Sequence, residues 1–480
     1  MTRPHILLIT TDQQRYDALG INGNRELQTP NLDCLAANGV NFERCYSTCP
    51  VCIPARRTLI SGQHPFTHGL RKYTDGLEWD PPFTLPGILS DAGYETRLIG
   101  KLHLHPQGKR YGYDHMLLSE TSNSRPASET QHRNDYVRWL KQNGIDEHPH
   151  FHGINGNGRL VSNWPLEDRF HHNNWLAREA TQYLCDDRDP SAPFFLHLSF
   201  FHPHPPLVPL KEYNDRYDPG SMEASSMGKW VPDLPTRPGT APDSALGPFD
   251  PEVMQRARAG YYALINHIDD CVAHVLERWQ EYGNPRAKEP LYILYSSDHG
   301  EMLGDHHLFR KSLCYEGSSH IPFFIGGSNV DIQPGPSREL CCWEDVLPTI
   351  ADLAGVKLPG PVDGRSLAAL LRGEPDEECR DHLTGMCHGQ VDNYFQVRGP
   401  HKYIWFPKTN EEQLFNLEED PKELHDLSGN EKLLIPFRHS MAEELEEADK
   451  LHSQWGATYD PSQLVPCNNR PPLAIYGKER

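Results

Sequence analysis

Residues 52–62 place a cysteine at the start of a predicted helix, where it could act on an anion. Pro54 suits the first turn of that helix and Gly62 suits its end. Unpaired backbone N–H groups and the positive end of the helix dipole would therefore lie beside Cys52. Arg56, one helical turn further on, could direct its guanidinium back to an oxyanion through two hydrogen bonds. The pattern indicates an activated thiolate or an anion-binding site.

Two other interpretations of Cys52 stay open at this point. It can be a buried core residue ahead of a capped helix, because free cysteine is among the most buried residue types. Its spacing from Cys49 also matches half of a zinc site, but no second cysteine pair stands nearby to complete a tetrahedron. We therefore treat Cys49 as a packing residue.

Carboxylates follow two of the apolar runs of the chain. Asp12 and Gln13 come soon after the first run, and Asp298 and His299 come soon after a later one. If both runs are strands of one parallel sheet, these side chains meet at its carboxyl edge. Two carboxylates with an amide oxygen and an imidazole suit a divalent cation. An Asp-His-Gly sequence by itself also has a plainer interpretation, since Asp and Gly are ordinary turn residues.

Residues 52–62 resemble the signature of the type I sulfatases of the alkaline phosphatase superfamily. In that family, the cysteine of a Cys-x-Pro-x-Arg core is oxidised to formylglycine, and the eleven-residue match is highly specific. The resemblance implies that a formylglycine-generating or equivalent maturation enzyme converts Cys52 to an aldehyde, whose hydrate supplies the attacking oxygen. It also implies that one divalent metal ion is bound by four residues: Asp12, Gln13, Asp298 and His299.

Two of these metal positions depart from the family pattern. Family sulfatases often carry an aspartate where this chain has Gln13, and an asparagine where it has His299. Losing one negative charge weakens cation binding, and a nitrogen donor favours a transition ion. We expect calcium at this site, and the nitrogen donor makes manganese the alternative.

Three further segments, residues 100–103, 201–206 and 310–317, also resemble sulfatase motifs. Their candidate catalytic residues are Lys101, His103, His204 and Lys311. A sulfate ester needs cations around its oxygens, a nucleophile opposite the leaving oxygen, and an acid that protonates the departing alkoxide. Each of these side chains taken alone has a plainer interpretation, as a surface lysine or a structural histidine.

Combined with the resemblance, charge and geometry suggest a role for each residue in catalysis. The metal and Arg56 would lower the pKa of the hydrated aldehyde, and Asp298 would accept its proton before attack on sulfur. Lys101 would hold the sulfate. Two histidines complete the cycle: His204, helped by Lys311, would protonate the leaving oxygen, and His103 would deprotonate the second hydroxyl of residue 52 so that sulfate is expelled.

The elements that must position these residues alternate between strands and helices. Short apolar runs at residues 6–9, 96–99, 194–200 and 291–295 predict buried strands. This rhythm predicts an α/β fold with a large, mixed but mostly parallel sheet flanked by helices. The resemblance implies the same alkaline phosphatase-like architecture.

A smaller C-terminal α+β domain is expected after the linker at residues 373–376. Residues 394–397 and 401–406 predict hairpin strands there. We expect a catalytic domain over residues 1–373 and the smaller domain over 374–480. Segments at 397–403 and 413–423 resemble the small domain of sulfatases, so the resemblance extends from Asp12 to about residue 427.

Two stretches of the catalytic part lack clear periodicity. Residues 106–168 are expected to form a long surface insertion, rich in His and Trp, and residues 214–251 a loop that packs over the body. An amphipathic helix is predicted over residues 251–282. The two irregular stretches are the candidates for shaping the substrate subsite.

Composition excludes several classes of function. The 480 residues carry a net charge of −20, which argues against nucleic acid or an anionic membrane as partner. The mean hydropathy of −0.65 and the lack of a long apolar run argue against a membrane span. Asp12 cuts the first apolar run too short for a signal peptide, so the given chain predicts a cytoplasmic protein, and a periplasmic or secreted one if a leader was removed. The twelve cysteines are expected to be mostly free thiols.

The function that these observations predict is hydrolysis of a sulfate monoester, either a sulfated carbohydrate or an aryl or alkyl sulfate. A phosphonate monoester or phosphodiester hydrolase is the nearest alternative, because such relatives share the Cys-x-Pro-x-Arg core and the Asp-Gln pair. They usually lack the pattern of Lys101 and His103, which favours sulfate here. A non-catalytic glycan-binding protein is the alternative outside the enzymes.

Overall fold

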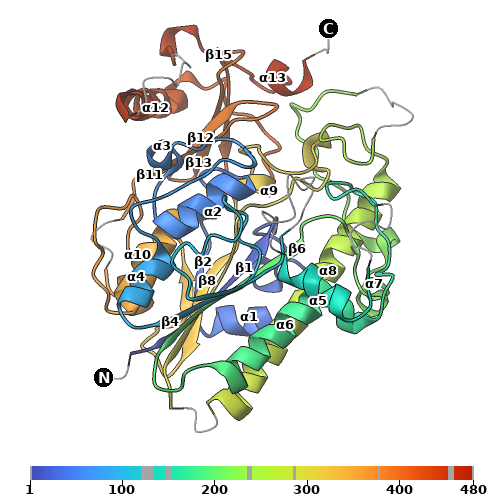
Figure 1. Cartoon of the computed structure of the whole chain (residues 1–480). Helices are drawn as coiled ribbons and strands as arrows, with labels where there is room; N and C mark the ends of the chain where they lie inside the picture. Colours follow the sequence, from blue (N-terminus) through green and yellow to red (C-terminus); the bar gives the residue numbers. More distant parts are fainter. Residues whose placement is uncertain are drawn as a thin grey trace.

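The computed structural model describes residues 3–120, 134–146, 154–234, 241–284, 288–375, 379–451 and 459–477. An eight-stranded sheet and a five-stranded sheet organise these residues. Figure 1 shows the larger sheet between two layers of helices, and the smaller sheet at the C-terminal end of the molecule.

The eight-stranded sheet confirms the predicted α/β fold and its mostly parallel strands. Its order is β5 (His115–Leu118), β4 (Glu95–Gly100), β6 (Phe194–Pro203), β1 (His5–Asp12), β7 (Leu291–Ser297), β8 (Phe323–Ser328), β2 (Val40–Phe42) and β9 (Gly335–Ser337). Strands β5, β4, β6, β1 and β7 run parallel, whereas β8 is antiparallel to β7 and β2. The four strands predicted from the apolar runs are therefore neighbours, and their carboxyl ends share one edge.

Residues of β1 alternate between two hydrophobic cores. Leu7 and Ile9 face one core, and Ile6 and Leu8 face the other. Because both faces of the sheet are covered, each strand must be apolar along its whole length. Burying each of these side chains contributes about 1.5–3 kcal/mol.

Helices cover both faces of the sheet (Figure 1). The first face carries α1 (Pro30–Ala37), α6 (His172–Gln182) and α8 (Pro251–Arg278). The second carries α2 (Cys52–Ser61), α4 (Leu85–Asp91) and α10 (Val346–Leu353). Helix α8 and the π-helical turn over Trp279–Gly283 that extends it together cover the helix predicted over residues 251–282.

The five-stranded sheet contains the predicted hairpin. Its order is β11 (His382–Cys387), β12 (Asn393–Arg398), β13 (His401–Phe406), β14 (Glu411–Asn416) and β15 (Val465–Pro466), and the first four strands are antiparallel. Helix α12 (Glu431–Leu451) packs against it. Backbone contact with the larger part is direct, since Met386 N donates to Thr48 O at 2.7 Å.

The remaining α-helices and strands are short. They are α3 (Pro65–His68), α5 (Asp135–Gln142), α7 (Lys211–Asn214), α9 (Glu316–Ser319), α11 (Ala368–Leu371), α13 (Leu473–Tyr476), β3 (Cys45–Tyr46) and β10 (Cys341–Cys342).

The expectation that residues 106–168 form only a surface insertion is wrong in part. Strand β5 extends the main sheet beside β4, and Trp164 is buried in the core that α6 and α8 cover. These apolar positions lie among polar residues, so their periodicity does not predict a strand. Residues 115–118 form one because they pair with β4. His132, His148, His150 and His152 of this stretch lie outside the described residues.

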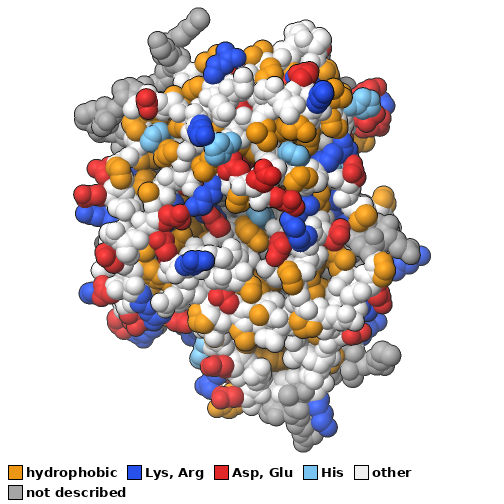
Figure 2. All heavy atoms as spheres, turned by 180° about the vertical axis from the view of Figure 1, so that it is seen from behind, with side chains coloured by type: hydrophobic (Ala, Val, Ile, Leu, Met, Phe, Trp, Pro, Cys, Tyr) orange, Lys and Arg blue, Asp and Glu red, His pale blue; other side chains and the backbone are white. Residues whose placement is uncertain are grey.

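The described part of residues 214–251 is mostly irregular, as expected, with a 3-10 turn at Pro219–Ser221. All twelve cysteines are free thiols in the structure. Within the described ranges, every helix is too short or too polar to cross a bilayer. Seen from behind, the molecule mixes acidic, basic and hydrophobic side chains over the same face (Figure 2).

His197, in the centre of the main sheet, makes stability depend on pH. Burial and the charge of Arg56 lower its pKa to about 3, against about 6.5 for an unfolded chain. Its ring nitrogens lie 2.9 Å from Thr10 Oγ1 and 2.8 Å from Tyr113 Oη. As the pH falls below about 6.5, the unfolded chain binds a proton that the folded protein does not, so stability is lost progressively down to about pH 3.

We therefore expect His197→Gln to flatten the pH dependence of stability. The free energy of unfolding should fall less steeply in the variant, by up to about 1.4 kcal/mol per pH unit between about pH 6 and 4. Urea denaturation at a series of pH values measures this slope. His439→Gln is the control, because its side chain is 74% exposed and its replacement should leave the slope unchanged. Equal slopes for wild type and His197→Gln would contradict the expectation.

Candidate active site

Segments far apart in the chain meet at the carboxyl edge of the main sheet. Asp12 ends β1, Asp298 and His299 follow β7, and Cys52 begins α2. One ligand atom from each of these four buried residues lies within 4.8 Å of the others. The edge therefore gathers two carboxylates, an imidazole and a thiol in one cluster.

Cys52 occupies the first residue of α2. Val51 before it is extended, and Gly62 ends the helix with a φ of 65°, as the pattern predicts. The Sγ of Cys52 lies 3.2 Å from His299 Nε2 and 3.9 Å from Asp12 Oδ1. Burial and Asp12 raise the pKa of this thiol, but the positive charges of Lys311, Lys101 and His299 outweigh them and leave it below its ordinary value. A cysteine here is poised to ionise.

The sequence suggested that the Arg56 guanidinium is available to bind an oxyanion. In the structure it binds carboxylates of the protein instead. Its Nε donates to Asp298 Oδ2 at 3.0 Å, and its Nη2 to Asp12 Oδ2 at 3.3 Å. The Nη1 atom donates to Lys101 O at 2.9 Å and to Ser199 Oγ at 3.2 Å. Two fully buried carboxylates require a buried countercharge, so the guanidinium is committed to holding them.

Lys101 makes a second buried ion pair at this edge. Its Nζ hydrogen-bonds Asp12 Oδ2, and both residues are 0% exposed. Burial raises the pKa of Asp12, but the charges of Lys101 and Arg56 hold it well below its usual range. Asp12 is therefore an ionised carboxylate at neutral pH.

Lys311 and His204 form a hydrogen-bonded pair at the rim of the cluster. His204 Nδ1 lies 2.6 Å from Pro205 O, an atom that can only accept, so Nδ1 carries the proton. His204 Nε2 then faces Lys311 Nζ at 2.7 Å. Burial and the charge of Lys311 lower the pKa of His204 well below its ordinary value. The transferable proton of this pair therefore resides on Lys311.

His103 lies beside Lys101 with a backbone φ of 56°. Its backbone N–H donates to Glu120 Oε1 at 2.8 Å. The centroid of its ring lies 5.8 Å from that of Tyr73, in an edge-on arrangement. Among the described residues its Nδ1 has no hydrogen-bond partner. Burial and the charges of Lys101 and Arg56 lower its pKa well below the ordinary value. A neutral imidazole with a free nitrogen can accept a proton.

The donor atoms fit a divalent cation. His299 Nδ1 lies 3.0 Å from Gly300 O, so Nδ1 donates there and Nε2 is left as a ligand atom. Nε2 lies 3.7 Å from Asp12 Oδ1 and 3.6 Å from Asp298 Oδ1. Burial lowers the pKa of His299, but Asp298 and Cys52 raise it to about 9, so Nε2 must lose its proton when a cation binds. Two carboxylates, the deprotonated imidazole and the Gln13 amide oxygen would form a mixed oxygen and nitrogen set, which suits Mn²⁺ and is compatible with Ca²⁺.

Three residues that position the site were not singled out from the sequence. Ser199 on β6 contacts Arg56, and Glu120 receives the backbone N–H groups of Leu102 and His103. Glu301, two residues beyond His299, hydrogen-bonds the side chain of Gln13. A carboxylate two residues beyond a proposed metal ligand was the one signal in the sequence, and no pattern there points to Ser199 or Glu120.

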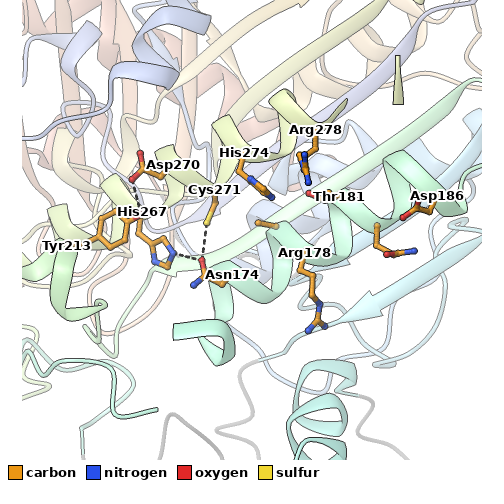
Figure 3. Close-up of a pocket in the computed structure, with 12 residues that line it drawn as sticks. Asn174, Arg178, Thr181, Asp186, Tyr213, His267, Asp270, Cys271, His274 and Arg278 are labelled. Carbon is orange, nitrogen blue, oxygen red and sulfur yellow. Dashed lines mark hydrogen bonds between the residues drawn. The ribbon is translucent and has the colours of Figure 1, made fainter. Parts of the chain in front are cut away.

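Two cavities lie apart from this cluster. A groove of about 380 Å³ lies between α6 and α8, where His267 contacts Asn174 and Tyr213 contacts Asp270 (Figure 3). A larger cavity of about 730 Å³ borders Glu316 and Glu423. Neither is lined by any of the ten predicted site residues.

Comparison with known proteins agrees with this geometry. The family model Sulfatase matches residues 4–356, and the model described as N-sulphoglucosamine sulphohydrolase, C-terminal, matches residues 304–451. An arylsulfatase from Clostridium perfringens (strain 13 / Type A) is 35% identical over 444 residues, which cover 90% of this chain and 91% of that protein.

Solved structures share the fold. The phosphonate monoester hydrolase of Agrobacterium radiobacter superposes with a TM-score of 0.75 at 23% identity, covering 94% of this chain and 96% of that one. BT4656, in complex with its substrate D-glucosamine-2-N,6-O-disulfate, superposes with a TM-score of 0.72 at 19% identity, covering 95% of this chain and 99% of that one. The family match spans most of the chain, and we conclude that this protein belongs to the sulfatase family of sulfuric ester hydrolases.

Proposed function

We propose that this protein hydrolyses a sulfate monoester once Cys52 has been converted to formylglycine by a maturation enzyme. One divalent metal ion would be held by Asp12, Gln13, Asp298 and His299. The observation that carries the proposal is the position of Cys52, at a helix N-terminus and 3.2 Å from His299 Nε2, beside two buried carboxylates. A reactive group at this position would stand next to the ion and to three cationic side chains.

The charge of the site supports an anionic substrate. Arg56, Lys101 and Lys311 bring three positive charges, and Asp12, Asp298 and Glu301, when ionised, bring three negative ones. A divalent ion would leave a local excess of about two positive charges. Since the whole chain has a net charge of −20, the grip on a sulfate ester must come from this local field.

The hydrated formylglycine would supply an attacking hydroxyl and then a second hydroxyl whose deprotonation expels sulfate, and the metal would supply positive charge beside them. Asp298 is the proposed acceptor for the proton of the attacking hydroxyl. Lys101 and Arg56 keep Asp12 ionised, and Arg56 also donates a hydrogen bond to Asp298. Lys101 would in addition present its charge to the sulfate oxygens.

The pair of Lys311 and His204 is the proposed proton source for the leaving oxygen. Lys311 Nζ carries the proton and donates it in a hydrogen bond to His204 Nε2. The leaving alkoxide can therefore be protonated by Lys311 directly, or by His204 after the proton has passed to its Nε2. His103, neutral and with a free Nδ1, is the proposed base for the second hydroxyl of residue 52.

The choice between sulfate and phosphonate esters is the direct test. We expect kcat/KM for an aryl sulfate to exceed that for the matching aryl phosphonate monoester by at least about tenfold, or about 1.4 kcal/mol of transition-state binding. The expectation rests on Lys101 and His103 and on the arylsulfatase relative. Specificity constants measured with the same aryl leaving group decide it, and a preference for the phosphonate would favour the phosphonate hydrolase instead. Sulfated sugars and alkyl sulfates assayed alongside define the substrate class.

A further inference from the structure

Gln13 is held at every polar atom it has. Its backbone has a φ of 72°, a left-handed conformation that is uncommon for a side chain of this kind. The backbone N–H donates to Asp298 Oδ1 at 3.1 Å, and the backbone oxygen accepts from Tyr261 Oη at 2.7 Å. In the side chain, Nε2 donates to Glu301 Oε2 and Oε1 accepts from Lys311 Nζ. A strained residue fixed at four points has a defined task.

The neighbours of Gln13 determine which way its amide points. An ionised carboxylate accepts hydrogen bonds but cannot donate them, and an ammonium donates hydrogen bonds but cannot accept them. The amide nitrogen must therefore face Glu301, and the amide oxygen must face Lys311. Turning the amide over would oppose two donors on one side and two acceptors on the other. The oxygen, which is the atom a cation requires, is thus kept on the side of Lys311 and away from Glu301.

Glu301 is itself rigidly placed. It is 1% exposed, and its Oε1 accepts from the backbone N–H groups of Leu303, at 2.9 Å, and of Arg310. Its backbone oxygen accepts from Arg15 Nη1 at 3.0 Å. One carboxylate oxygen is therefore used to anchor the side chain, and the other, Oε2, is directed at Gln13.

We propose that Glu301 is a positioning residue, which orients Gln13 for metal binding. Through its contact with the Gln13 amide it also supplies the negative charge that an aspartate at position 13 would carry. The inference rests on the metal site of the proposed function. It revises the expectation that Gln13 simply weakens the site, because the lost charge is present at Glu301, in contact with the amide.

The substitution Glu301→Gln isolates this role. The new side chain keeps an oxygen for the two anchoring backbone contacts and presents an NH₂ group to Gln13, so only that contact changes sense. Metal-free protein is titrated with Mn²⁺ in a calorimeter. We expect Mn²⁺ to bind the variant about 10–100-fold more weakly than it binds the wild type, while the melting temperatures of the two metal-free proteins stay close.

Two further variants make the result specific. Glu344→Gln is the matched control, because Glu344 is also 1% exposed and accepts a hydrogen bond from Thr48, away from the cluster. The affinity of this variant for Mn²⁺ should equal that of the wild type. Adding Gln13→Asp to Glu301→Gln should restore binding, because the charge is returned to position 13. Unchanged Mn²⁺ affinity in a folded Glu301→Gln protein would overturn the inference alone. Failure of the wild type to bind either Mn²⁺ or Ca²⁺ would overturn the metal site of the proposed function as well.

Discussion

Replacing Cys52 with alanine is expected to lower kcat for sulfate ester hydrolysis by at least about 10,000-fold and to leave the fold intact. The side chain at position 52 is the proposed source of the nucleophile, and removing a nucleophile eliminates the covalent route entirely. The structural cost is small, because alanine keeps the helix and deletes a single sulfur atom from a residue that is 2% exposed. Steady-state kinetics and circular dichroism of the purified variant test both parts.

Cys49→Ala is the matched control for this prediction. Cys49 is buried three residues away, outside the cluster of metal-ligating atoms, so its loss should change kcat only slightly. Mass spectrometry of the peptide that spans Cys52 in the wild-type protein supplies the independent reading, since conversion of CH₂SH to CHO removes sulfur. Activity retained in Cys52→Ala would refute the role of this residue. A wholly unconverted thiol from the native host would support the non-catalytic glycan-binding alternative.

Removing the metal is expected to reduce activity by at least about 1,000-fold, because a divalent ion contributes several kcal/mol of charge stabilisation. The protein should stay folded, since Arg56 and Lys101 already neutralise the buried carboxylates of Asp12 and Asp298. Treatment with a chelator, followed by separate additions of Mn²⁺ and Ca²⁺, measures the loss and its recovery. The ion that restores the higher kcat/KM is the one the donor set serves best.

The control for chelation is a sample treated with chelator already saturated with the same ion, which should keep full activity. Asp298→Asn should show the same loss, and neither ion should restore it, because the variant lacks one of the two carboxylates. Full activity in protein whose metal content is far below one ion per chain would contradict the metal requirement.

Local patterns in the sequence predicted the elements that carry the chemistry. The unbroken apolar run of β1 indicated a strand covered on both faces, and the structure has Leu7 and Leu8 in opposite cores. Pro54 and Gly62 predicted α2 closely, because helix initiation and termination depend on nearby residues. Short, irregularly spaced apolar positions gave no such signal, and β5 was missed inside residues 106–168 for that reason.

Residue type, local spacing and the family resemblance therefore predicted the candidate reactive residues, and the family match supports the family itself. Only the tertiary structure decided how these residues are used. It commits Arg56 to two carboxylates instead of an oxyanion, leaves the proton of the His204 pair on Lys311, and brings Glu301 to Gln13 across 288 positions of sequence. Such contacts depend on which strands become neighbours and on the charges that burial forces together, and neither is encoded in a short stretch of chain.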